Sequence, residues 1–244
     1  MLKSERHTYI LQQLNQAGVL RVKELAVRLN VSPITIRRDL EALEAEGQLR
    51  RVHGGAVLRE PQESGQQRAD TLEQRIADTA ARFIPPNSVL FLGPGPLVRE
   101  MIPFLAERTD LTIITNALDV AWSAARLHRH TLHLLGGQVE EGYAIYGESE
   151  HLAQLRADWI VLQVEGIDPM QGITHDHMAY AVMARELFRS TAQLMALAPP
   201  HQVGRAGAVF IAPAEELDVL ITGREAANAP LWDLSELGVR IILA

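Results

Sequence analysis

The residues with the most readable chemistry lie between Ser32 and Leu40 of this 244-residue chain. Ser32 is a favourable N-cap and Pro33 suits the first helical position, so the run predicts a helix that begins here. Ile36, Leu40 and Leu43 recur at helical spacing and predict an inward face. The opposite face carries a hydroxyl and two guanidinium groups, which are groups that meet phosphates and base edges in DNA-reading helices. The outward-facing set is Ile34, Thr35, Arg37, Arg38 and Glu41.

Each outward residue type suits a particular contact with DNA. Arg37 and Arg38 suit base edges or phosphates, because a guanidinium group can form two hydrogen bonds at once. Ile34 can meet a thymine methyl group, and Thr35 can contact a base or a phosphate. Basic residues beside a later Gly-Gly turn are expected to hold a hairpin against the DNA backbone. The predicted DNA-binding residues are therefore Ser32, Ile34, Thr35, Arg37, Arg38, Arg50, Arg51 and His53.

Other elements must hold this helix in place. A first apolar stripe predicts a helix that Ser4 can cap and Gly18 can end. A shorter stripe over residues 25–29 predicts a second helix, and Gly47 closes the DNA-reading helix. Residues 49–57 surround the Gly-Gly turn and predict a two-stranded hairpin. Three helices followed by a hairpin make a winged helix-turn-helix.

A set of spaced residues runs through these elements: Arg6, Ile10, Leu14, Ser32, Thr35, Ile36, Arg37, Arg38, Asp39 and Leu40. The set resembles the N-terminal signature of the DeoR family of bacterial transcriptional regulators, spacing included. The resemblance implies operator binding, more often in repression than in activation. It also implies a second domain similar in fold to ribose-5-phosphate isomerase, which in the family usually binds a phosphorylated sugar or related metabolite. An amphipathic three-helix module with incidental arginines is the alternative interpretation.

Composition limits the class of protein. The chain has no cysteine, which excludes disulfides, thiolate metal sites and cysteine catalysis. No apolar run is long enough for a membrane span and no secretory signal is recognisable, so we expect a cytoplasmic protein. The lysines are Lys3 and Lys23 alone, so no lysine base or Schiff base can form in the C-terminal part.

Charge is divided unevenly along the chain. Residues 1–59 hold ten Lys and Arg against six Asp and Glu, a net charge of +4. Residues 60–244 hold 13 Arg against 24 acidic residues, a net charge of −11. A surface for phosphates therefore belongs to the N-terminal part, and the acidic remainder has another task. We expect a DNA-binding domain over 1–58, a polar linker over 59–70, and an effector-sensing and oligomerisation domain over 71–244.

Beyond the linker, short apolar runs alternate with helical stripes. The runs that predict strands are Val89–Leu92, Leu111–Thr115, Leu132–Leu135, Trp159–Val164, Leu194–Leu197, Val219–Thr222 and Val239–Leu243. The stripes that predict helices include Leu72–Phe83, Leu97–Leu105 and Ala179–Ala192. This alternation predicts the α/β class, with a mainly parallel sheet covered by helices on both faces. The prediction agrees with the isomerase-like fold that the resemblance implies.

Small or polar residues follow successive predicted strands. In a parallel sheet the ligand crevice lies at the carboxyl ends of the strands, so these residues together predict a pocket. Each glycine taken alone is explained as well by a turn. The resemblance continues here through Thr115-Asn116, Leu135–Gly137, Gly147 and Gly166–Asp168. The predicted effector-binding residues are Gly93, Gly95, Asn116, Gly136, Gly137, Gln163, Glu165, Asp168 and His175.

The phosphate-holding residues that the resemblance implies are missing. The family carries an Asp-Ser-Gly-Thr-Thr-like loop after its first sensor strand, whereas this chain has Gly93–Leu97 with two prolines that lack backbone donors. A family Asp-Ser-Ser-Lys-like stretch is replaced by Pro199–Gln202. Two interpretations stay open. Either the effector is atypical, for example less polar or unphosphorylated, or sensing has been lost and the domain serves oligomerisation.

The residues of the C-terminal domain fit other functions less well. His175 and His177 form a His-x-His pair, but no third metal ligand follows at a suitable spacing. A sugar-phosphate isomerase needs an acid–base pair and a phosphate grip, which these loops do not supply. A purely architectural DNA-binding protein without a ligand is a third class. We expect no catalytic residue, metal or cofactor, and no membrane contact. The expected partners are double-stranded operator DNA, a small sugar-like effector, and further copies of the chain in a homodimer or homotetramer.

Overall fold

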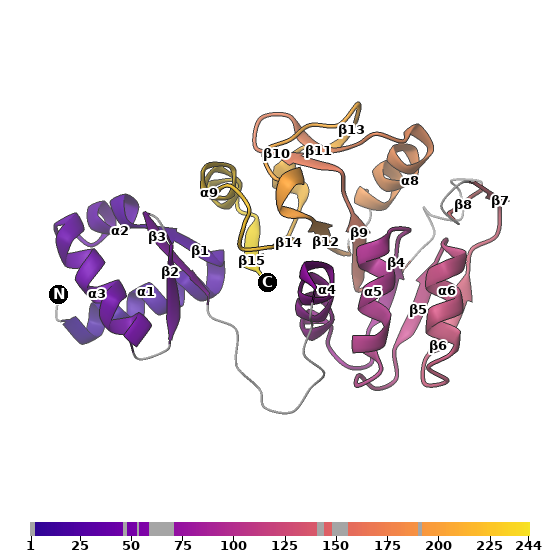
Figure 1. The fold of residues 1–244 in the computed structure, drawn as a ribbon, viewed down its shortest axis with the longest axis horizontal. Helices are drawn as coiled ribbons and strands as arrows, with labels where there is room; N and C mark the ends of the chain where they lie inside the picture. Colours follow the sequence, from indigo (N-terminus) through magenta and orange to yellow (C-terminus); the bar gives the residue numbers. More distant parts are fainter. Residues whose placement is uncertain are drawn as a thin grey trace.

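The computed structural model shows a mixed α/β chain with a small N-terminal part and a larger C-terminal part (Figure 1). The residues that it describes are 3–45, 48–52, 54–58, 71–140, 144–147, 156–189 and 192–244. The predicted linker over 59–70, together with Gly47 and His53, lies outside them. No helix within the described ranges is long and apolar enough to cross a membrane.

The N-terminal part, here called the head (residues 3–58), is a winged helix-turn-helix as predicted. Its elements are α1 (Lys3–Ala17), β1 (Val19–Arg21), α2 (Val22–Arg28), α3 (Pro33–Ala45), β2 (Leu49–Val52) and β3 (Gly55–Leu58). The strands form an antiparallel sheet in the order β1-β3-β2. Apolar residues at helical spacing meet in one core, where Ile10, Leu14, Ile36 and Leu40 are fully buried. That shared core fixes α3 against the other two helices.

The ends of the head's helices test the predicted caps. The N-cap prediction holds for Ser32, whose Oγ accepts the Thr35 N–H at 3.2 Å. Gly18 ends α1 with φ 75°, a left-handed conformation that suits glycine. The Ser4 prediction is wrong, because α1 begins at Lys3 and Ser4 lies inside it. Strand β1 was not predicted, since a three-residue strand is too short to show alternation.

The C-terminal part, here called the body (residues 71–244), is built around a parallel sheet. In the described residues it has seven strands in the order β15-β14-β12-β9-β4-β5-β6. Their bounds are β4 (Val89–Leu92), β5 (Thr112–Thr115), β6 (Thr131–Leu134), β9 (Trp159–Gln163), β12 (Gln193–Ala198), β14 (Val219–Thr222) and β15 (Arg240–Leu243). Every strand that was predicted in this part is present, and all neighbours pair in parallel.

Helices cover both faces of this sheet (Figure 1). One face packs against α4 (Leu72–Phe83), α5 (Pro96–Leu105) and α6 (Leu118–Ala125), and the other against α8 (Met178–Phe188) and α9 (Asn228–Glu236). Alternate side chains of a strand enter the two cores, as in β4, where Leu90 and Leu92 face one core and Phe91 the other. The body is therefore a three-layer α/β/α fold, as the strand–helix alternation predicted. Helix α8 ends earlier than the predicted Ala192.

Smaller elements that were not predicted lie beyond the sheet. Strands β10 (Gly166–Asp168), β11 (Gly172–His175) and β13 (Val209–Ala212) form an antiparallel sheet, and β7 (Gln138–Val139) pairs with β8 (Ile145–Tyr146). Two short 3-10 helices, η2 (Pro200–Gln202) and η3 (Ala214–Glu216), follow β12 and β13. These segments are two to four residues long, which is too short to give a periodic signal.

The head packs directly against one edge of the body. Gly18 approaches the backbone of edge strand β15 so closely that a Cβ atom there would lie 1.8 Å from the carbonyl oxygen of Ile241. Val19 and Val57 of the head join the apolar core that contains Trp232 of α9. Strand β15 therefore has one neighbour in its own sheet and the head on its other side.

Candidate functional site

The exposed face of α3 presents the predicted DNA-reading residues together. Ile34 is 61% exposed, and Arg37 and Arg38 are also exposed. Thr35 is half-buried, and its Oγ1 lies 2.9 Å from Ser32 Oγ. These side chains therefore project from the first turns of α3, where a helix in the major groove meets base edges.

A polar anchor behind α3 sets its position in the head. Asp39 is 2% exposed and accepts two hydrogen bonds from Arg6 of α1, at 2.8 and 3.1 Å. His7 Nε2 lies 3.3 Å from the same carboxylate. The hydrogen bond to Asp39 raises the pKa of the Arg6 guanidinium, which keeps its charge. Asp39 thus connects α3 to α1 inside the head, although it is adjacent in sequence to the exposed Arg38.

The wing is the hairpin formed by β2 and β3. Its two described basic residues differ in whether they are already paired within the head. Arg50 is exposed on β2. Arg51 is tied to α3, because its guanidinium donates to Glu41 at 2.8 Å and its backbone N–H donates to Glu44 at 2.8 Å. Arg50 is therefore exposed and can contact a DNA phosphate. Arg51 would have to give up its ion pair with Glu41 to contact one. His53 lies outside the described residues.

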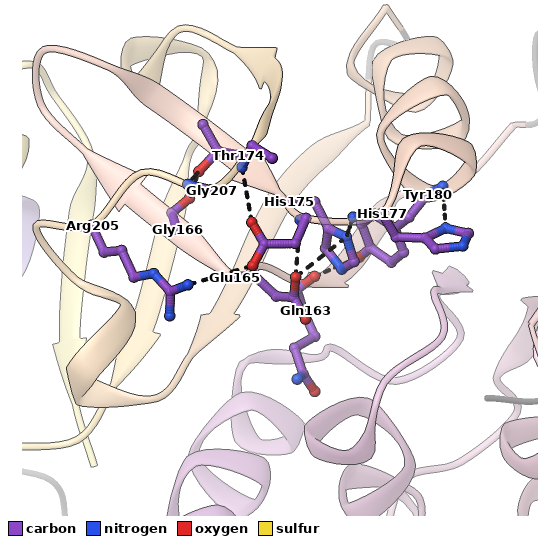
Figure 2. Close-up of polar contacts among 11 residues, drawn as sticks. Gln163, Glu165, Gly166, Thr174, His175, His177, Tyr180, Arg205 and Gly207 are labelled. Carbon is purple, nitrogen blue, oxygen red and sulfur yellow. Dashed lines mark hydrogen bonds and ion pairs between the residues drawn. The ribbon is translucent and has the colours of Figure 1, made fainter. Parts of the chain in front are cut away.

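We call the carboxyl ends of β4 and β9, where the strand order reverses, the crevice of the body. Strands β5 and β6 follow β4 on one side, whereas β9 and β12 continue on the other, so the switch point falls between β4 and β9. Ligands of open parallel sheets bind outside the carboxyl ends of the strands at such a point. Here the loop that follows β4 meets Gln163, the last residue of β9, and Glu165 lies two residues further along the chain. Both residues are labelled in Figure 2.

Gln163, at the end of β9, is held from both sides. Its side-chain Oε1 accepts the backbone N–H of Leu97, in the first turn of α5, at 2.9 Å. Its backbone carbonyl accepts the hydroxyl of Tyr180, from α8 (Figure 2). Burial raises the pKa of Tyr180, which keeps this hydroxyl protonated as a donor. Gln163 therefore joins α5 to α8 through one hydrogen bond of its side chain and one of its backbone.

Glu165 and His175 face one another beside Gln163. Glu165 accepts the backbone N–H of Asp176 at 2.9 Å, and one of its oxygens lies 3.6 Å from His175 Nδ1. His175 Nδ1 also accepts the backbone N–H of His177 at 3.0 Å, so this nitrogen carries no proton and Nε2 carries it. Burial lowers the pKa of His175, and its ring stacks on Tyr180 with centroids 3.9 Å apart. The site offers a carboxylate acceptor and a neutral imidazole donor.

The β7–β8 hairpin packs against the same region. Tyr146 stacks on His177 with ring centroids 5.8 Å apart, and Glu140 lies 3.4 Å from His177 Nε2. Burial raises the pKa of Tyr146 to about 12, so its hydroxyl stays protonated at neutral pH. His177 also caps α8, because its side chain accepts the backbone N–H of Tyr180. The hairpin thus meets the start of α8 through stacked rings and through the contact of Glu140 with His177.

Asn116, at the end of β5, ties the hairpin down. Its side-chain NH₂ donates to the carbonyl of Ile145 at 2.9 Å, and the Ile145 N–H donates back to the Asn116 carbonyl at 2.6 Å. Its side-chain oxygen is buried and has no hydrogen-bond partner among the described residues. A buried acceptor without a partner is costly, so a ligand hydroxyl at this point would satisfy it.

The other three predicted effector-binding residues make contacts within the chain. Gly136 and Gly137 contact the backbone of Gly147 and Tyr146. Asp168 accepts the backbone N–H groups of Met170 and Gln171, both at 2.9 Å, and so holds the β10–β11 turn. The structure therefore brings together Gly93, Gly95, Gln163, Glu165 and His175 at the switch point, with Asn116 beside the hairpin.

Sequence reasoning missed the aromatic residues of the crevice. Tyr180 and Tyr146 gave no signal, because each looks like an ordinary apolar position in a helix or a short strand. The sequence showed His177 only as part of a His-x-His pair with His175. Its position just before a predicted helix was the signal that could have identified it as the N-cap of α8. Within the described ranges, no group of three or more His, Asp or Glu residues is placed to hold a metal ion.

Two sequence families match the chain in succession. A family model described as the DeoR-like helix-turn-helix domain matches residues 6–62, and one described as the DeoR C terminal sensor domain matches residues 70–224. The first covers the head and the second most of the body. Both sites described above therefore lie inside matched segments.

Similar proteins include regulators from other bacteria. The chain is 30% identical over 236 residues to the protein named "Uncharacterized HTH-type transcriptional regulator FruR" of Bacillus subtilis (strain 168), covering 92% of this chain and 93% of that protein. It is 36% identical over 148 residues to the "Lactose phosphotransferase system repressor" of Streptococcus mutans serotype c, covering 57% and 59%. A solved ribose 5-phosphate isomerase from Plasmodium falciparum superposes with a TM-score of 0.40 and 15% identity, covering 54% of this chain and 52% of that one.

Proposed function

The chain belongs to the DeoR family of transcriptional regulators, and from this premise we propose that it represses an operon for carbohydrate transport or catabolism. The head binds operator DNA through the exposed face of α3, with Arg50 on the backbone. A small metabolite at the carboxyl ends of β4 and β9 controls that binding. The family consists of regulators, so the isomerase-like body serves as a sensor rather than as an enzyme.

The observation that carries the DNA-binding proposal is the exposed, braced start of α3. Ile34, Arg37 and Arg38 project into solvent from a helix whose inner face is fully buried and whose Asp39 is fixed to α1. A rigid helix that presents arginines loses little conformational freedom when it enters a groove. The positive charge of the N-terminal segment adds a sequence-independent attraction to phosphates.

The metabolite class follows from the relatives as well as from the crevice. The matched segment is described as a sensor, and one relative is named as a repressor of a lactose phosphotransferase system. Glu165, His175 and Asn116 supply acceptors and a donor that suit the hydroxyl groups of a carbohydrate. We infer that the protein acts in the cytoplasm as a dimer or tetramer, because one short reading helix gives limited affinity and specificity.

The joint between head and body offers a route for control. Arg21 of the head donates to Asp233 and Glu236 of α9, both at 2.7 Å, and lies over the Trp232 ring. The head is therefore seated on the body at β15 and α9 rather than held only by the chain connection. A ligand that shifts this edge of the sheet changes where the reading helices lie in an oligomer, and so changes operator affinity.

The test is replacement of one reading arginine. We expect Arg38→Ala to weaken binding to a duplex recovered by in vitro selection by about 1–3 kcal/mol, roughly 5- to 150-fold, because a bidentate contact is lost. Quantitative footprinting measures the affinity, and thermal unfolding and gel filtration confirm the fold and assembly. Arg126→Ala, which removes an exposed arginine at the end of α6, is the matched control and leaves the affinity unchanged. Equal protection by wild type and Arg38→Ala would show that another surface reads the DNA.

A further inference from the structure

We propose that the side chain of Gln163 occupies the place of a ligand phosphate, so that the effector of this protein is recognised without a phosphate group. The inference rests on the proposed function of the body as a sensor. It names the chemistry of the molecule that is sensed and the residue that selects it.

Gln163 uses the donor that a phosphate would need. The first turn of a helix attracts anions through its free N–H groups, and α5 begins at the switch point of the sheet. Pro94 and Pro96 supply no N–H in this loop. The N–H of Leu97 is already donated to Gln163 Oε1 at 2.9 Å. A phosphate oxygen that accepts the Leu97 N–H would require the same position, so at this donor the side chain and a phosphate exclude one another.

The loop and Gln163 are also in direct contact. Gly95 has φ 143°, and a Cβ atom built on it would lie 2.7 Å from Gln163 Oε1 and 2.8 Å from Gln163 Cβ. Glycine at this position permits the approach, and no gap separates the loop from the side chain. The hydroxyl of Tyr180 fixes the Gln163 backbone from the opposite side (Figure 2). Gln163 is therefore held by the loop after β4, by the first turn of α5 and by α8.

The charged and polar groups beside Gln163 suit the hydroxyl groups of a ligand. Arg205 is paired with Asp176 at 3.4 Å, and the lysines of this chain are both in the head. His175 is neutral because its Nδ1 accepts a hydrogen bond, and the carboxylate of Glu165 lies next to it. Hydroxyl groups can hydrogen-bond to both of these residues.

The experiment removes the side-chain amide of Gln163 and measures whether the protein then binds phosphate. The full-length protein is titrated calorimetrically with inorganic phosphate and with ribose 5-phosphate. We expect no saturable binding to the wild type, and binding at least about tenfold tighter in Gln163→Ala, the effect of regaining one charge-assisted hydrogen bond. Gln193→Ala, at an exposed position that begins β12, is the matched control and stays like the wild type.

Two further variants make the outcome decisive. Gln163→Glu keeps an acceptor for Leu97 and is expected to fold like the wild type and bind no phosphate. Gln163→Ser shortens the side chain but stays polar, and replaces Gln163→Ala if that variant unfolds. Saturable phosphate binding by the wild type, or none by the folded shortened variants, overturns the proposal. These titrations contain no DNA, so their failure is separate from a failure of the Arg38→Ala test.

Discussion

At the scale of single residues, burial assigns different tasks to neighbours in the sequence. Arg38 is exposed on α3, whereas the adjacent Asp39 is buried and receives two hydrogen bonds from Arg6. In the crevice, His175 is stacked and neutral, whereas His177 caps α8 and lies within ion-pair distance of Glu140. Residue type alone does not separate these roles, because each depends on what lies against the side chain.

The buried imidazole of His175 predicts a dependence of stability on pH. Burial is the main cause that lowers its pKa in the folded chain, so below about pH 6.5 the unfolded chain takes up the proton first. The free energy of unfolding therefore falls as the pH falls through this range, and above it His175 contributes no change. In His175→Phe, which keeps a ring on Tyr180, we expect Tm to fall less between pH 7 and pH 5 than in the wild type.

Thermal unfolding by circular dichroism at several pH values measures this difference. His133→Phe, at an exposed position on β6, is the control and keeps the slope of the wild type. Identical slopes for wild type and His175→Phe would contradict a buried neutral His175.

At the scale of elements, two helices of the body show two ways to satisfy a helix N-terminus. Helix α4 carries its own capping box, in which Thr71 Oγ1 accepts the Gln74 N–H and the Gln74 side chain accepts the Thr71 N–H. Helix α5 has no side-chain cap at Gly95 and receives Gln163 from a distant strand instead. The first helix start is readable in the sequence, while the second requires the sheet to bring β9 beside β4.

The capping box of α4 gives a prediction for stability alone. Thr71→Ala removes the acceptor for Gln74, and we expect the free energy of unfolding to fall by about 1 kcal/mol. Chemical denaturation measures the change, and Thr71→Ser, which keeps the hydroxyl, stays close to the wild type. Operator affinity at a permissive temperature is expected to be unchanged, because α4 carries no residue of either site. A loss as large in Thr71→Ser would indicate that packing of the methyl group, not the cap, is what matters.

At the scale of the whole molecule, the head is seated on the body by both backbone and side chains. Gly18 lies against the backbone of β15, and Arg21 bridges Asp233 and Glu236 while covering Trp232. The carboxyl groups of Glu24 and Glu236 also meet here, and burial together with this contact raises the pKa of Glu24. The joint is polar at its rim and apolar inside, which suits an interface that can be shifted.

The contact between head and body predicts a local change in stability when Arg21 is replaced. Arg21→Ala removes half-exposed ion pairs and a cation–π contact, so we expect a loss on the order of 1 kcal/mol in head–body docking. Hydrogen exchange followed by mass spectrometry should show faster exchange in α9 and β1, with the main sheet unchanged. Arg189→Ala, which removes an ion pair with Glu186 at the end of α8, is the control. Unchanged exchange in α9 would mean that Arg21 does not hold the joint.

The sequence by itself determined the helices of the head and the strands of the parallel sheet. Helical spacing placed α3 and its exposed arginines, and short apolar runs placed every strand of the parallel sheet, because periodicity and capping are local properties of the chain. It also showed that the loop after β4 lacks phosphate-holding residues, and membership of the family agrees with the DNA-reading head.

Only the tertiary structure decided how distant segments meet. The contact of Gln163 with Leu97 joins residues 66 positions apart, and that of Arg21 with Glu236 joins residues 215 positions apart. No local pattern encodes such pairs, since they depend on strand order at the switch point and on which edge of the sheet the head covers. The sequence therefore showed a loop with two prolines after β4, and the structure showed that Gln163 of a distant strand contacts this loop.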